Sequence, residues 1–257
     1  QLNSSNFIYI SHNHPDHLHP LTLSKINKNI KIVVPNFVTK STEMYIKDLG
    51  FYNVEVLDFN VQYNLANTKL NFSLFKSGDF REDSGLYFSN GEFTGLLSVD
   101  ANMINFDRLP KVNFYGSSFA GGASGYPIMF DNYSFKEKEN ISIKNKKFIK
   151  KRVCESLKKI MPNYFMPYAG FFNEKLRRDN QILKNNKKNS IEDYSQFCKL
   201  NKINILNVYK NDFYKFNGNK LIYKKNKIVK EKKDLIPEKY LEYFKKEYKK
   251  IDEDYIK

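Results

Sequence analysis

The chain has 257 residues, of which 41% are hydrophobic and 16% aromatic, and its formal net charge is +15. That length and content suit one large domain or two small ones with a proper core. No apolar run approaches the roughly 18 residues of a membrane-spanning helix, and no basic-then-apolar segment at the start predicts a signal peptide. Lys and Asn are overused throughout, so we discount the charge as a sign of nucleic-acid binding and do not expect a nucleic-acid partner. The charge still favours an anionic small substrate, although by itself it does not choose between a nucleotide-sugar and a polynucleotide.

The two cysteines, Cys154 and Cys198, lie far apart and have no metal-binding or redox spacing. This usage is typical of reduced thiols. The sequence therefore predicts a cytoplasmic protein without membrane partners.

The first part of the chain alternates between strands and helices. Residues 6–11 form an apolar run of strand length, and a short helix is predicted from Pro20, where a missing N–H does no harm. Residues 30–35 predict a second buried strand. A helix over 39–49 should end at Gly50, the usual left-handed stop.

An all-β stretch follows, with a strong hairpin turn at Asn90-Gly91. The predicted strands are residues 54–59, 69–76, 85–89, 92–98 and 112–116. A glycine-rich segment, residues 119–127, comes after the last of them.

Helical and strand-like patterns mix again in the rest of the chain. The predicted elements are a helix over 145–160, a strand over 164–168, a helix over 191–200, strands near 203–208 and 220–223, and an amphipathic helix over 235–251. Mixed strands and helices of this kind predict an α/β sandwich.

All four histidines fall between His12 and His19, directly after the first predicted strand. Side chains alternate along an extended segment, so His12 and His14 point the same way and can reach one ion. Asp16 and His17 follow a proline, where the chain turns, and could face a second ion or the surroundings of the first. Imidazole is the commonest protein ligand for metals, so the sequence predicts a metal site here.

The run His-x-His-x-Asp-His resembles the metallo-β-lactamase fold, a four-layer αβ/βα sandwich. The resemblance implies that His12 and His14 bind one metal and that the Asp16–His17 pair binds a second. Asp100, which ends the apolar stretch 96–99, fits the bridging position. The first strands of that fold would precede this chain, so we expect a fragment that lacks them.

The chain departs from this pattern because no histidine follows His19, whereas the family uses two later ones. His12, His14 and Asp100 then form a set of two imidazoles and one carboxylate, the ligands of non-haem Fe(II) oxygenases. A carboxylate in the loop where a lost histidine would fall could instead restore a hydrolase site. The candidates are Asp79, Glu82 and Asp83.

A closer resemblance covers roughly residues 6–175. The motifs that carry it are Phe7–Leu18, Val99–Pro110, Phe119–Pro127 and Pro167–Phe172. In this order they resemble the CMP-N-acetylneuraminate hydroxylase family, monooxygenases that convert the N-acetyl group of activated sialic acid to N-glycolyl. The resemblance implies Fe(II), O₂ and a CMP-linked sugar. It also implies a Rieske [2Fe–2S] domain, supplied with electrons by a b-type cytochrome or a ferredoxin-like protein.

A Rieske centre needs two cysteines and two histidines, and neither cysteine here is near a histidine. We therefore expect the electron donor on a missing N-terminal part or on a partner. Residues 1–175 are predicted to be an N-terminally truncated catalytic domain, and residues 176–257 to complete it with a Lys-rich polar extension.

On this interpretation Asp16 and Asp100 are the catalytic carboxylates. The backbone at Gly121 and Gly122 can approach a ligand closely and cradle its phosphate, with Ser124 in the same segment, although a tight structural turn is the alternative. Two further residues are substrate-binding candidates. They are Arg108, as an anion contact or a surface ion pair, and Tyr168, as an aromatic wall or a core aromatic.

Two other functions stay open from the sequence. One is a metal-dependent hydrolase of a phosphodiester, lactone or ester, a nuclease included, which would generate hydroxide on Zn or Mn. The other is a degenerate, non-catalytic binding module that has lost its metal.

Overall fold

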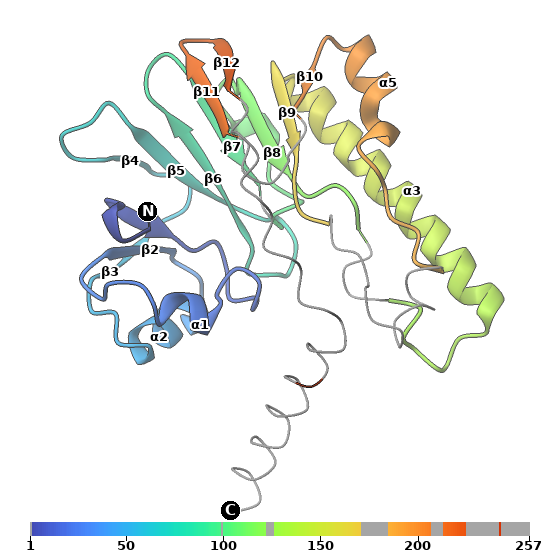
Figure 1. The fold of residues 1–257 in the computed structure, drawn as a ribbon, viewed down its shortest axis with the longest axis horizontal. Coiled ribbons are helices and arrows are strands. Elements are labelled where there is room, and N and C mark those ends of the chain that lie inside the picture. Colours follow the sequence, from blue (N-terminus) through green and yellow to red (C-terminus); the bar gives the residue numbers. More distant parts are fainter. Residues whose placement is uncertain are drawn as a thin grey trace, which may run out of the picture.

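The computed structural model describes residues 2–98, 100–121, 126–170, 185–206, 213–224 and 242. The first sheet, here sheet A, has three parallel strands in the order β1-β2-β3, and two helices connect them (Figure 1). The elements are β1 (Phe7–Tyr9), α1 (Pro20–Leu23), β2 (Lys31–Pro35), α2 (Ser41–Asp48) and β3 (Val54–Leu57), after a short 3₁₀ helix η1 (Leu2–Ser4). The predicted strand–helix–strand–helix unit is confirmed.

Sheet B has seven strands in the order β10-β9-β8-β7-β6-β5-β4. Its strands are β4 (Gln62–Asn64), β5 (Asn71–Lys76), β6 (Ser84–Ser89), β7 (Thr94–Leu97), β8 (Phe114–Ser117), β9 (Tyr164–Pro167) and β10 (Asn204–Ile205). The run from β4 to β7 is antiparallel, and the run from β7 to β10 is parallel. The sequence predicted every strand of this sheet except β4, which is short and polar. A 3₁₀ helix, η2 (Phe106–Arg108), connects β7 to β8.

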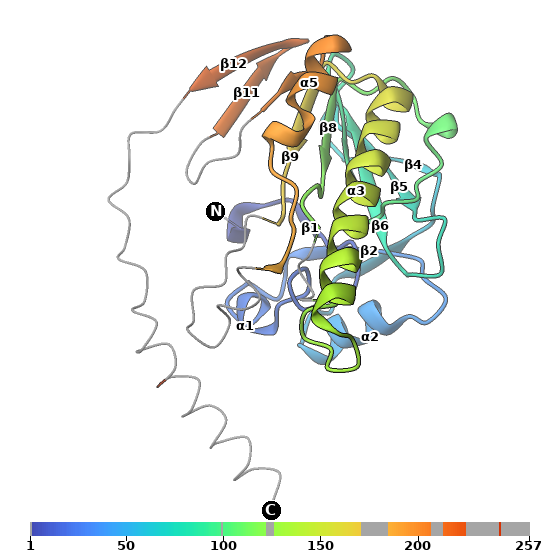
Figure 2. The ribbon, with the colours of Figure 1, turned by 90° about the vertical axis from the view of Figure 1, so that its right-hand side faces the viewer.

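Two helices, α3 (Phe135–Ile160) and α5 (Glu192–Leu200), cover the outer face of sheet B (Figure 2). Helix α3 begins about ten residues before the position predicted from its apolar pattern. The start is a capping box in which the Ser134 hydroxyl accepts from the backbone N–H of Glu137, while the Glu137 carboxylate accepts from the N–H of Ser134. The first N–H groups of a helix have no partner within the helix, and a capping box supplies acceptors for them. A helix can therefore begin on a polar turn that buries little apolar surface.

We expect Ser134→Ala to lower the free energy of unfolding by about 1 kcal/mol, the usual cost of losing an N-cap side chain. Chemical denaturation monitored by circular dichroism measures the change. Ser134→Asp is the matched control, because aspartate caps as well as serine does. Equal stability of the alanine and aspartate variants would contradict a capping role.

The layers follow from which side each strand residue faces. On β2, Ile32 and Val34 pack against the α1 and α2 side, whereas Val33 lies between them in sequence and packs against Leu74 of sheet B. On the far side of sheet B, Tyr115 and its neighbours pack against α3 and α5. The order is therefore helix, sheet, sheet, helix (Figures 1 and 2), and the predicted four-layer sandwich is confirmed.

A hairpin of β11 (Phe213–Asn217) and β12 (Lys220–Lys224) packs on the inner face of sheet B beyond the edge of sheet A. The ring of Phe216 stacks on Phe93 with centroids 4.2 Å apart. The sequence predicted the second strand of this hairpin and missed the first. The predicted helix over 235–251 lies outside the described residues except for Glu242. Within the described ranges, no helix combines the length and apolar character needed to cross a bilayer.

Candidate metal centre

The histidine-rich loop leaves sheet A where β1 ends. The N–H of Ile10, just after β1, donates a hydrogen bond to the carbonyl of Val33 in β2. The chain then turns, because the carbonyl of His14 accepts from the N–H groups of both His17 and Leu18, and Leu18 is buried as an anchor. This turn brings His17 back beside the histidines that precede it.

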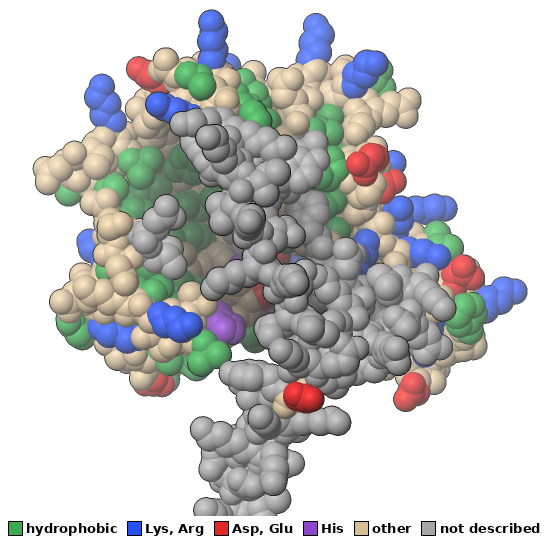
Figure 3. Space-filling model, in the orientation of Figure 1, with side chains coloured by type: hydrophobic (Ala, Val, Ile, Leu, Met, Phe, Trp, Pro, Cys, Tyr) green, Lys and Arg blue, Asp and Glu red, His purple; other side chains and the backbone are tan. Residues whose placement is uncertain are grey.

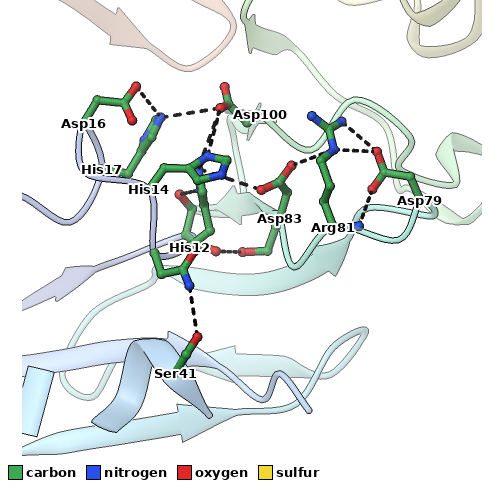
Figure 4. Close-up of polar contacts among 12 residues, drawn as sticks. His12, His14, Asp16, His17, Ser41, Asp79, Arg81, Asp83 and Asp100 are labelled. Atoms are coloured by element: carbon green, nitrogen blue, oxygen red, sulfur yellow. Dashed lines mark hydrogen bonds and ion pairs between the residues drawn. The ribbon is translucent and has the colours of Figure 1, made fainter. Parts of the chain in front are cut away.

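Three imidazoles and one carboxylate converge at this point (Figure 4). His12 Nε2 lies 2.9 Å from His14 Nδ1, and the His12 and His17 ring centroids are 4.3 Å apart. Asp100 Oδ2 lies 3.7 Å from His12 Nε2 and 3.8 Å from the facing nitrogens of His14 and His17. One carboxylate oxygen thus faces all three rings.

A second carboxylate comes from the start of β6. Asp83 Oδ1 lies 3.8 Å from His12 Nε2, and Asp83 is buried. Its other oxygen, Oδ2, makes no hydrogen bond and has Arg81 Nε at 3.4 Å. A buried carboxylate oxygen without a hydrogen bond is costly unless it has a charged partner or coordinates a cation.

The structure distinguishes the three acidic residues of this loop. Asp79 is held by the Arg81 guanidinium through Nε and Nη2, at 2.9 and 2.6 Å, and the same contacts lower the pKa of its carboxyl against the opposing effect of burial. Glu82 accepts from the backbone N–H and the hydroxyl of Thr39. Of the three, Asp83 faces the histidines.

Among the residues that the structure describes, two groups have ligand atoms that all lie within 4.8 Å of one another, and they share His12. One consists of His12, His14 and Asp83, the other of His12, His17 and Asp100. Each is a set of two imidazoles and one carboxylate, and Asp83 turns Oδ1 toward His12 while Arg81 faces its Oδ2. The residues present therefore fit a metal ion. Asp16 lies outside both groups, with its carboxylate 77% exposed and 3.4 Å from His17 Nε2.

Burial shifts the pKa of two residues of this cluster, His12 and Asp83. It lowers the pKa of His12 to about 4, with a further lowering from His17 that outweighs the effect of Asp100. Burial also raises the pKa of Asp83, against the opposing effect of Arg81. A neutral imidazole has a free lone pair, so His12 is ready to coordinate a metal near pH 7.

The cluster is open to solvent on one side. The side chain of His14 is 50% exposed, and histidine side chains reach the surface in the view of Figure 3. A cavity of about 450 Å³ opens beside His14 and Asp83. Its other lining residues are Asn13, Thr39, Ser41, Phe80, Arg81 and Glu82. A small molecule can therefore reach the candidate ligands from this side.

Two of the predicted substrate residues are held in packed surroundings. Gly121 has a φ of +73°, and a Cβ there would lie 2.3 Å from a side-chain methyl of Ile149. The ring of Tyr168 lies over Gly116, where a Cβ would come within 2.9 Å of it. Both positions follow the carboxyl ends of strands of sheet B, the same end of the sheet as Asp100.

The structure does not place the other predicted substrate residues beside the histidine cluster. Arg108 lies on η2, and its neighbour Asp107 is 3.6 Å from Lys159 in the last turn of α3. That turn precedes β9, so it lies at the opposite end of sheet B from Asp100. Gly122 and Ser124 fall outside the described residues.

The chain is similar to several proteins named cytidine monophosphate-N-acetylneuraminic acid hydroxylase. It is 31% identical over 215 residues to the cytidine monophosphate-N-acetylneuraminic acid hydroxylase of Danio rerio, covering 80% of this chain and 36% of that protein. It is 30% identical over 210 residues to the enzyme of the same name from Sus scrofa, covering 78% and 48%. The chain thus spans less than half the length of these relatives. No protein-family model matches the chain.

Solved structures with a related arrangement are distant in sequence. A CmlA beta-hydroxylase variant is 16% identical with a TM-score of 0.49, covering 80% of this chain and 44% of that chain. The metallo-β-lactamase fold protein YhfI of Bacillus subtilis is 11% identical with a TM-score of 0.42, covering 81% and 77%. At these scores the likeness is partial. The predicted resemblance to the CMP-N-acetylneuraminic acid hydroxylases is confirmed by the sequence relatives, and the order of the layers is that of the αβ/βα sandwich predicted with it.

Proposed function

We propose that this chain is the metal-binding catalytic part of a hydroxylase that acts on a CMP-linked sialic-acid-like sugar. The observation that carries the proposal is the ligand set at His12, in which each group pairs two imidazoles with one carboxylate. That set with open positions is the one used by non-haem Fe(II) oxygenases. The similarity to proteins named as hydroxylases supports the substrate class.

The chain's own residues hold and orient the reacting partners. His12, neutral because burial lowers its pKa, offers Nε2 to the ion together with a carboxylate from Asp83 or Asp100. The imidazole of His12 has one lone pair at Nε2, so the two groups cannot both be complete around separate ions. The exposed edge at His14 leaves a side for the sugar to enter through the cavity. Fe(II) bound here would supply the oxygen-activating chemistry, with electrons from a Rieske [2Fe–2S] protein or domain.

The electron donor would be separate from the described residues. Cys154 lies on α3 and Cys198 on α5, and both helices cover the face of sheet B opposite sheet A, away from the histidines. A b-type cytochrome or a ferredoxin-like protein would reduce the Rieske centre. Residues 176–257 would complete the catalytic domain, since β10 pairs with β9 and α5 packs in the same core as α3.

A metal-dependent hydrolase is the second candidate, and Asp83 favours it. A carboxylate beside His12 and His14 could replace a lost histidine and allow two ions to be held, with Asp100 between them. The ions held there would supply hydrolytic chemistry toward a phosphodiester, lactone or ester.

Metal analysis after anaerobic purification, followed by assay with CMP-N-acetylneuraminate, distinguishes the two. The hydroxylase predicts about one iron per chain and an N-glycolyl product that needs O₂, a reductant and the Rieske protein. Omitting the reductant is the control, and it should abolish product. About two zinc or manganese ions with hydrolysis in the absence of reductant would replace the hydroxylase by the hydrolase.

A further inference from the structure

A series of hydrogen bonds through the hydroxyl groups of Tyr9 and Ser84 joins the two loops that carry the candidate metal ligands. The Ser84 hydroxyl donates to the backbone carbonyl of Ser11 at 2.7 Å, and Ser84 Oγ lies 2.6 Å from the Tyr9 hydroxyl oxygen. A serine hydroxyl has one hydrogen, and here it is used on Ser11. The Tyr9 hydroxyl therefore donates to Ser84, and the direction of both hydrogen bonds is fixed.

This series of hydrogen bonds connects the two sheets next to the cluster. Tyr9 is the last residue of β1 in sheet A, and Ser84 is the first residue of β6 in sheet B. In sequence, Ser11 directly precedes His12, and Ser84 directly follows Asp83. The two hydrogen bonds thus fix the backbone next to His12 relative to the backbone next to Asp83.

The same series of hydrogen bonds reaches the His12 ring. Ser11 Oγ lies 2.9 Å from His12 Nδ1, so Nδ1 is engaged and Nε2 faces Asp83 and Asp100. An imidazole that binds a metal through Nε2 carries its proton on Nδ1 and donates it to a neighbouring acceptor. The Ser11 hydroxyl oxygen is in place to accept that proton.

Water cannot readily replace these hydroxyl groups. Ser84 is 0% exposed and Ser11 is 5% exposed. Burial raises the pKa of Tyr9, against the opposing effect of its bond to Ser84, so its hydroxyl stays protonated and remains a donor. Removing one partner of a buried hydrogen bond leaves the other polar group unsatisfied, and water cannot reach it to replace the lost hydrogen bond.

We propose that Tyr9, Ser84 and Ser11 are positioning residues for the metal centre. They fix the separation of the His12 and Asp83 loops and the orientation of the His12 ring, and they do not touch the ion. This inference rests on the metal site of the proposed function. It adds a set of supporting residues that lie outside the histidine motif and come from both sheets.

The test is Co²⁺ binding by the purified protein, measured by competition with a chelator and by the visible spectrum of the bound ion. Tyr9→Phe removes one hydroxyl, and Ser84→Ala removes the link to Ser11. We expect each to weaken Co²⁺ binding about 10–100-fold, the range for residues that orient metal ligands, and to change the spectrum. Tyr194→Phe is the matched control. It removes another buried tyrosine hydroxyl, bonded to the Phe119 carbonyl at 2.7 Å in the core beneath α3 and α5.

Thermal unfolding of the metal-free variants separates positioning from stability. If Tyr9→Phe and Ser84→Ala lose stability but bind Co²⁺ as tightly as wild type, with the same spectrum, the positioning role is overturned while the metal centre stands. Ser11→Ala serves if either variant does not fold, because it removes only the contact to His12 Nδ1. Absence of Co²⁺ binding by the wild type would overturn the metal centre, and this inference with it.

Discussion

Replacing His12 by alanine should abolish metal binding, with affinity falling by more than about 100-fold. His12 is the one residue shared by both candidate ligand groups, so its loss leaves neither with two imidazoles. Elemental analysis of the purified variant, made anaerobically, measures the loss.

The chain offers a control in the same loop. His19 is the N-cap of α1, where its Nδ1 accepts from the backbone N–H of Thr22, and it belongs to neither ligand group. His19→Ala should therefore keep the full metal content. Circular dichroism of both variants verifies that they are folded. Equal metal content in the two variants would rule out a site centred on His12.

Leu74→Ala is expected to lower the free energy of unfolding by about 2–5 kcal/mol, the range for truncating a buried leucine. Leu74 is 0% exposed and lies between the two sheets with Val33, Leu57 and Phe72. Because β5 is clamped between β4 and β6, its backbone cannot collapse into the cavity left behind, so the cost should fall in the upper part of the range.

Urea denaturation of the metal-free protein measures this cost without interference from ligand binding. Leu200→Ala at the end of α5 is the control, since its side chain is 76% exposed and its loss should change stability by less than about 0.5 kcal/mol. A similar small effect for Leu74 would mean that sheets A and B do not pack on each other as described.

Metal removal should itself lower stability, because an ion that binds only the folded protein stabilises it by mass action. The effect links the two expected results: His12→Ala should bring the unfolding midpoint of the metal-loaded protein down to that of the metal-free wild type. The Leu74 variant should lose stability equally with and without metal.

Much of the site can be predicted from local sequence. His12 and His14 are two positions apart, so the alternation of an extended segment is enough to predict that they face the same way, whereas the turn after Pro15 leaves open whether His17 faces the same ion. The elements with strong apolar periodicity, such as β2 and the body of α3, are predicted for the same reason. Their pattern is a property of a few consecutive residues.

Other features depend on contacts between distant residues. Asp79, Glu82 and Asp83 have the same chemistry and lie in one short loop, so the sequence leaves all three open. Arg81 holds Asp79, Thr39 holds Glu82, and the start of β6 directs Asp83 toward His12. The start of α3 was missed because polar capping, rather than apolar spacing, decides where it begins.

The sequence by itself determined that a histidine-rich loop follows a buried strand and that the architecture is α/β, since both patterns lie in residues close together along the chain. Only the tertiary structure decided that Asp83 joins the cluster, that Asp16 stays at its surface, and that Tyr9, Ser84 and Ser11 brace it. The physical reason is that these contacts cross between two sheets. Which side chains meet there is set by the packing of the whole sandwich, and no local pattern carries that information.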